Sequence, residues 1–145
     1  LQDAENILDS LPEMADLNRD LSVTVNGGKF TVKVPAYWKE YGVWTTENDR
    51  IVFYEKLSKN SSQACGGRLV TIGVYAFEDK SYETASFKHL GLLTDADGKQ
   101  WHLVASLPTD VQAHLCAAPL YGAMQSDLAD IYISVLPAEG YTHTP

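Results

Sequence analysis

The stretch "GGRLVTIGVYAF", residues 66–77, decides the fold that the sequence predicts. Successive residues of a strand point to opposite faces of a sheet. Both alternating sets here are mostly apolar, with Leu69 and Tyr75 in one and Val70 and Ile72 in the other. A strand that is apolar on both sides is covered on both sides. We therefore predict that this stretch forms a central strand.

Two glycines, Gly66 and Gly67, stand directly before this strand in the sequence "ACGGR". Glycine-rich loops hold phosphate groups when they lead into a helix. A strand follows here, so the phosphate-loop and dinucleotide-binding interpretations lack their structural context. We expect the two glycines to form a tight bend or to allow a close backbone approach where the strand begins.

The first of three hairpins is predicted over residues 21–35, around the Asn-Gly-Gly turn at 26–28. Apolar and polar residues alternate on both sides of this turn, which is typical of paired strands. A two-residue loop keeps the apolar side chains on one face. It places Val23 opposite Phe30 or Val32.

The second hairpin follows a short aromatic segment, 36–42, which is expected to form a turn or one helical turn. Its own turn is predicted at Asn48-Asp49. That register brings Glu47 opposite Arg50, and an oppositely charged pair across two strands supports it.

The third hairpin is predicted from Asp97-Gly98, which is a strong signal for a type I′ turn. This turn brings Leu93 opposite His102 in the paired strands. His102 is therefore interpreted as a residue on a strand face rather than as a metal ligand.

A helix is predicted near the C-terminal end, over about 119–135. Pro119 fits its first turn, and Pro137 ends it. Burial of its apolar stripe, at about 25 cal/mol per Å² of apolar area, is worth several kcal/mol. The tail after the helix is expected to add a short edge strand or to lack regular structure. The stripe recurs at steps of three and four residues: Leu120, Met124, Leu128, Ile131 and Val135.

Together these elements predict an α+β fold. The expected core is a curved antiparallel sheet of about six or seven strands, built from hairpins, with the C-terminal helix packed on one face. The chain has 145 residues, which is the size of one domain. Residues 1–20 are predicted to be an acidic helical lead-in, and 21–145 a single α+β domain.

The composition argues against several classes of partner. The net charge of −8 is the opposite of what nucleic acids and anionic membrane surfaces attract. No apolar run approaches the roughly 20 residues that span a membrane, so no membrane insertion is expected. The sequence carries no nucleotide-binding, hydrolase or close metal-ligand motif, and no cofactor and no metal site are predicted.

Several motifs resemble those of a group of small exported or lipid-anchored proteins of Gram-positive bacteria, a group without an assigned activity. The motifs are "GGRLVTIGVY", "PTDVQ" and the closing helix "YGAMQSDLADIYISVL", and the resemblance extends over residues 29–136. It implies a secreted or lipoprotein-like chain, outside the cell or anchored to its envelope. It implies no catalytic residue. The layout is more distantly similar to the Mog1/PsbP-like α/β sandwich.

The two cysteines, Cys65 and Cys116, leave three interpretations open. Two cysteines in an exported chain favour a disulfide, which would close a loop of about 50 residues and contribute on the order of 4 kcal/mol. Two inert thiols are the second interpretation. The third is a reactive Cys65, with Arg68 lowering the pKa of the thiol and His114 as the base.

Candidate binding residues are the aromatics Trp38, Tyr41 and Trp44, together with Arg68 and Asp110. Aromatic side chains near turns either line a recognition surface or belong to the core. Asp110, in "PTDVQ", either binds a ligand or organises a turn.

The function that the sequence favours is a non-enzymatic binding or interaction module at the bacterial cell surface. Its ligand would be a peptide, a glycan or a small molecule. A hydrolase or transferase that uses Cys65 or Asp110 is one alternative. A structural spacer domain that binds no ligand is the other.

Overall fold

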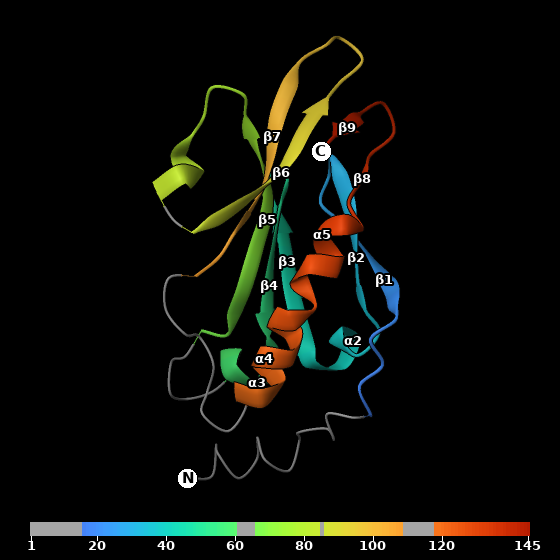
Figure 1. Ribbon diagram of the computed structural model, residues 1–145, viewed down its shortest axis with the longest axis vertical. Coiled ribbons are helices and arrows are strands. Elements are labelled where there is room, and N and C mark those ends of the chain that lie inside the picture. The colour runs from blue at the N-terminus through green and yellow to red at the C-terminus, as the bar shows by residue number, and fades with distance from the viewer. Residues whose placement is uncertain (1–15, 61–65, 85, 109–117) are drawn as a thin grey trace.

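Two antiparallel sheets and a C-terminal pair of helices make up the computed structural model, which describes residues 16–60, 66–84, 86–108 and 118–145. The larger sheet has six strands in the order β3-β4-β5-β7-β6-β9, and the smaller has the order β1-β2-β8 (Figure 1). The α+β class that the sequence predicts is thus confirmed, but the first hairpin lies with β8 in the smaller sheet and not in the larger one. The strands are β1 (Leu21–Asn26), β2 (Phe30–Pro35), β3 (Gly42–Glu47), β4 (Arg50–Glu55), β5 (Arg68–Ala76), β6 (Phe87–Thr94), β7 (Gln100–Ser106), β8 (Leu136–Pro137) and β9 (Thr142–Thr144).

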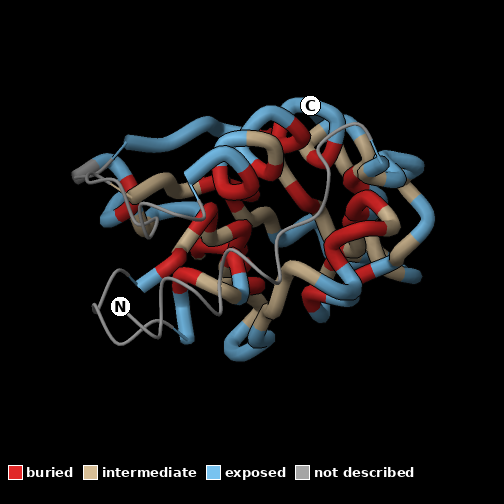
Figure 2. The backbone as a smooth tube through the Cα atoms, turned by 90° about the horizontal axis from the view of Figure 1, so that it is seen from below, coloured by how far each residue is buried: buried red, intermediate tan, exposed pale blue. Residues whose placement is uncertain are grey.

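The predicted central strand is β5, which lies between β4 and β7. Leu69, Val70 and Ile72 of this strand are completely buried. Figure 2 shows the buried segments, in red, gathered in the interior and surrounded by exposed turns. Both faces of β5 are covered, as its two apolar sets require.

Short helices connect these strands. The aromatic segment after β2 forms one helical turn, α2 (Trp38–Tyr41), as predicted. Two more single turns, α3 (Lys56–Lys59) and the 3₁₀ helix η2 (Ser81–Thr84), were not predicted from the sequence. None of the described helices is both long and apolar enough to cross a membrane.

The C-terminal helix packs where the two sheets meet. It consists of α4 (Ala118–Ser126), which contacts β4 and β5, and α5 (Leu128–Ile133), which contacts β2. In Figure 1 the pair runs along the molecule in front of the larger sheet and beside β1 and β2. The predicted stripe is confirmed, because all five of its residues are buried.

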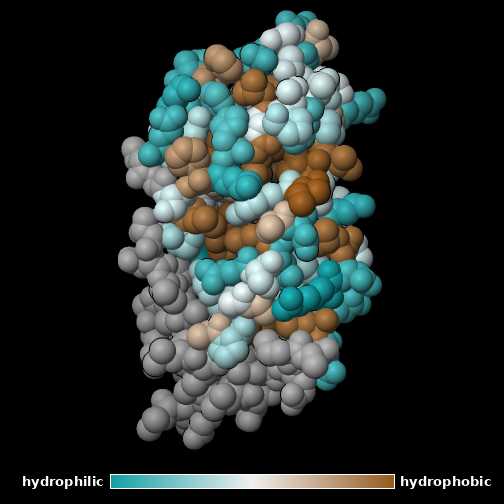
Figure 3. All heavy atoms as spheres, in the orientation of Figure 1, coloured by the Kyte–Doolittle hydropathy of each residue, from teal (hydrophilic) through white to brown (hydrophobic). Residues whose placement is uncertain are grey.

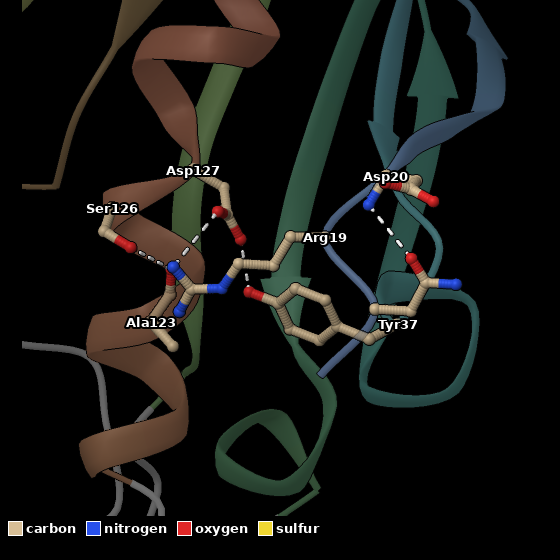
Figure 4. Close-up of polar contacts among 7 residues, drawn as sticks. Arg19, Asp20, Tyr37, Ala123, Ser126 and Asp127 are labelled. Carbon is tan, nitrogen blue, oxygen red and sulfur yellow. Dashed lines mark hydrogen bonds and ion pairs between the residues drawn. The ribbon is translucent and has the colours of Figure 1, made fainter. Parts of the chain in front are cut away.

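The expectation of one continuous helix is corrected at Asp127, which separates α4 from α5. The Asp127 side chain is buried and accepts a hydrogen bond from the Tyr37 hydroxyl. The Arg19 guanidinium lies 3.9 Å from its other oxygen, and Figure 4 shows both partners reaching Asp127 from outside the helix. Burial, followed by the hydrogen bond to Asp127, raises the pKa of Tyr37 far above its usual value. These bonds tie the helix to the segment around β1 and β2.

The predicted register is observed in the second hairpin and differs from the observed one in the first and third hairpins. The second hairpin is confirmed, with Glu47 opposite Arg50 and positive φ angles of 54° at Asn48 and 59° at Asp49. In the first hairpin the loop has two residues, as predicted, but it lies at Gly28-Lys29. Val23 is therefore opposite Val34, and its predicted pairing with Phe30 or Val32 is wrong.

The first turn moves because Gly28, with a φ of 97°, provides the positive angle that a type II′ turn needs at its first central position. The Gly27 amide donates to the Phe30 carbonyl at 2.8 Å and closes the loop there. This placement still keeps Val25 opposite Val32, both buried, on one face.

The third hairpin is shifted by one residue, so the predicted pairing of Leu93 with His102 is wrong. Leu93 lies opposite Trp101, and His102 opposite Leu92. The Asp95 carboxylate accepts hydrogen bonds from the amides of Asp97 and Lys99, both at 2.9 Å. These bonds stabilise a longer loop than the predicted two-residue turn.

The two glycines before β5 have the structural role that the sequence predicts. Gly66 and Gly67 have φ angles of 84° and 72°. The Gly67 carbonyl accepts a 2.7 Å hydrogen bond from the amide of Glu55, at the end of β4. The Glu55 side chain is itself buried and caps α3, where it accepts hydrogen bonds from the amides of Leu57 and Ser58. The predicted close backbone approach at the start of β5 is therefore confirmed, here between Gly67 and Glu55.

Candidate binding groove

A bulge in β6 determines which side chains this strand gives to each face of the larger sheet. The register with β7 shifts between His89 and Gly91, so one residue of β6 is extra. Gly91 has a φ of 127°, and a Cβ atom there would lie 2.3 Å from the Thr144 carbonyl oxygen. A bulge re-aims the residues beyond it. It turns Leu90 toward the core and His89 toward the outer face.

Beside this bulge lies a groove of about 620 Å³ between α5 and the edge of β6. Leu90 and Val135 are buried at its base, whereas Ile133 is 82% exposed. Figure 3 shows hydrophobic residues, in brown, gathered around this part of the molecule. The apolar lining consists mainly of Leu90, Ala129, Tyr132, Ile133 and Val135.

The edge of β6 is open along this groove. On the side away from β7, β9 pairs with Leu92, Leu93 and Thr94. Within the described ranges no strand pairs with residues 87–90 on that side. A strand edge without a partner presents backbone N–H and C=O groups to a second chain.

The groove is bounded at one end by β9 and its flanking residues. His143, in β9, lies 2.8 Å from the Leu90 carbonyl oxygen through Nε2, so this nitrogen carries the proton and donates. Pro145 also lines this end. On the α5 side, burial raises the pKa of Tyr132 to about 12.

On the outer face of the sheet, His89 and His102 form a hydrogen-bonded pair. His102 Nε2 lies 2.7 Å from the Phe77 carbonyl oxygen and donates to it. His102 Nδ1 therefore accepts from His89 Nε2 at 2.9 Å, which fixes both tautomers. The Phe77 ring stacks on His102, and Tyr82 lies between His102 and Phe87.

This pair predicts a pH dependence of stability. Partial burial, then the neighbouring His102 and Lys80, lower the pKa of His89. The unfolded chain therefore binds this proton more readily than the folded one, and stability is lost as the pH falls below the unfolded value of about 6.5. Urea denaturation between about pH 7.5 and pH 5 measures the loss.

The matched control is His89→Asn, which removes the titrating ring. We expect the stability of this variant to fall less than that of the wild type over the same pH range, because the contribution of His89 is removed. The other titrating groups remain in both proteins. Equal slopes for the two proteins would show that His89 keeps its ordinary pKa.

The aromatic residues singled out in the sequence lie away from this groove. Trp38 is completely buried and makes an edge-to-face contact with Phe53, so it is a core residue and not part of a recognition surface. Trp44 is partly buried and also contacts Phe53. Tyr41 lines a separate hollow of about 370 Å³ beside Ala36.

The other candidates divide into one described residue and four that are not described. Arg68 is partly buried and donates through Nη1 to the Thr71 hydroxyl at 3.1 Å, while its carbonyl accepts from the Tyr121 hydroxyl. Cys65, Asp110, His114 and Cys116 lie outside the described residues. The disulfide and the thiol hypotheses therefore stay predictions.

Sequence reasoning did not find Ile133, Lys88 or His143 as groove residues. A glycine within the apolar run "HLGLL" is a signal for a bulge, and it could have marked Gly91. The groove itself arises from the packing of α5 against a half-covered sheet edge. No local pattern encodes that arrangement.

The chain has no match among protein-family models, curated protein sequences or solved structures. No residue role can therefore be transferred from a relative, and the resemblance to exported proteins stays a prediction.

Proposed function

We propose that this protein is a peptide-binding module that takes up an extended segment at the edge of β6. The observation that carries the proposal is the open edge at residues 87–89 beside an apolar groove. An added strand gains backbone hydrogen bonds from the edge, and its alternate side chains enter the adjacent groove. The module works outside the cell in this proposal, as the resemblance to exported proteins implies.

The shape of the groove favours an extended peptide strand over a compact small molecule as the ligand. The groove runs along the strand edge, and its far wall is the helix α5. Ile133 projects at this wall with most of its surface exposed. Covering such a side chain contributes about 1.5–3 kcal/mol. Apolar side chains at every second position of an added strand would supply that cover.

Selection from a displayed library of short random peptides tests the proposal. Wild-type protein is expected to select peptides with apolar residues at alternate positions. Ile133→Gln should weaken the binding of the selected peptides about tenfold or more, because the apolar contact that Ile133 makes with the peptide is lost. Leu136→Gln is the matched control: Leu136 is also exposed, at 56%, but does not line the groove.

Backbone methylation of a selected peptide tests strand addition itself. Peptide N–H groups that face β6 alternate with those that face away. Methylation at every second position should therefore abolish binding, and methylation at the intervening positions should leave it nearly unchanged. Uniform tolerance of methylation, or equal binding to Ile133→Gln, would contradict the proposal.

A further inference from the structure

The groove has a lysine at its rim. Lys88 lines it together with His143, and none of the described lining residues is an aspartate or glutamate. The whole chain, in contrast, has a net charge of −8. The groove is therefore a partly apolar site with a cationic side chain at its rim, on an acidic protein.

Lys88 is available to a ligand. It lies on the open stretch of β6, opposite Ala105 of β7, whose side chain belongs to the core. The ion pairs found among the described residues are Arg19–Asp127 and Lys29–Asp49, and Lys88 takes part in neither. The Lys88 side chain is exposed at the rim of the groove.

His143 is held in place at the end of the groove. Its Nε2–H donates to the Leu90 carbonyl oxygen, which fixes the position of the ring. A carboxylate on the ligand is the acceptor that the ammonium group of Lys88 favours.

From the exposed Lys88 and the absence of acidic residues among the described lining residues, we infer that the ligand is an acidic peptide, in which an aspartate or glutamate among apolar residues binds Lys88. This inference rests on the proposed function and adds the chemical class of the ligand. Electrostatic complementarity of this kind supplies specificity and speeds association. The interaction weakens at high salt, because the groups at the rim are screened.

The peptide selection described above, repeated with Lys88→Glu, tests the inference. Peptides selected by the wild type are expected to be enriched in aspartate and glutamate at one position. Changing that residue to its amide in a synthetic peptide should weaken binding to the wild type about tenfold, and binding to Lys88→Gln less than about twofold. Lys88→Glu should instead prefer a peptide with lysine at that position.

Lys39→Glu is the control for overall charge, because it makes the same change in net charge on α2, away from the groove. It should select acidic peptides as the wild type does. Acid enrichment that persists in Lys88→Glu would overturn the inference.

The outcomes separate this inference from the proposed function. Neutral apolar peptides that bind with the alternating methylation pattern would uphold strand addition and overturn the acidic ligand. Failure to select any peptide would overturn both. Sedimentation of the wild type as a dimer that Ile133→Gln converts to a monomer would put a second copy of the chain in the groove, and would also overturn both.

Discussion

Replacement of Phe53 with alanine is expected to lower the free energy of unfolding by about 3–5 kcal/mol. Phe53 is completely buried in β4. Its ring lies 5.5 Å from that of Trp38 and 5.7 Å from that of Trp44, centroid to centroid. Loss of the ring removes apolar burial and leaves a cavity between two aromatic neighbours that are held by α2 and β3. Urea denaturation measures the change.

Phe87→Ala is the matched control for this prediction. Phe87 is 41% exposed and contacts Tyr82 at the outer face of the sheet. Its loss should cost about 1 kcal/mol, the value of one aromatic contact. Similar costs at the two sites would mean that Phe53 does not anchor the core.

Gly67→Ala is expected to destabilise the protein by about 2 kcal/mol more than Gly98→Ala. Both glycines have a positive φ, 72° and 84°, so both variants carry the strain of a left-handed alanine. At Gly67 a Cβ atom would also lie 2.6 Å from the Glu55 carbonyl oxygen and 2.7 Å from the Lys59 amide nitrogen. At Gly98 nothing lies within 4 Å.

The comparison of these two variants isolates the backbone contact. The neighbours of Gly67 are main-chain atoms, which cannot move aside by rotation of a side chain. Thermal or urea denaturation of the two variants gives the difference in the free energy of unfolding. Equal destabilisation would show that the entry to β5 relaxes without cost.

Local sequence signals predicted much of the fold. The apolar residues in both alternating sets of 68–77 identified the central strand. The stripe from Leu120 to Val135 identified the buried face of the C-terminal helix. Asn48-Asp49 gave the correct register because both residues adopt the positive φ angles of its turn. In each case neighbouring residues determine the outcome.

The features that escaped prediction depend on contacts between distant residues or on side chains that compete with the backbone. The Asp95 carboxylate lengthened the third hairpin loop. Asp127, where the helix breaks, contacts Tyr37 and Arg19, which are far away in the sequence. The groove is formed jointly by residues of α5, the bulged part of β6 and β9. Trp38 is in the core because the helical turn that carries it faces inward.

The short strand β9 has a consequence for the length of any ligand. It pairs with Leu92–Thr94 of β6 while joined to the same chain. A tethered strand competes with a free peptide at an effective concentration on the order of millimolar. A short peptide that pairs with residues 87–89 leaves β9 in place, with His143 bonded to the Leu90 carbonyl, and avoids this competition. A longer one must displace β9, so the protein itself limits how much of the edge a ligand can occupy.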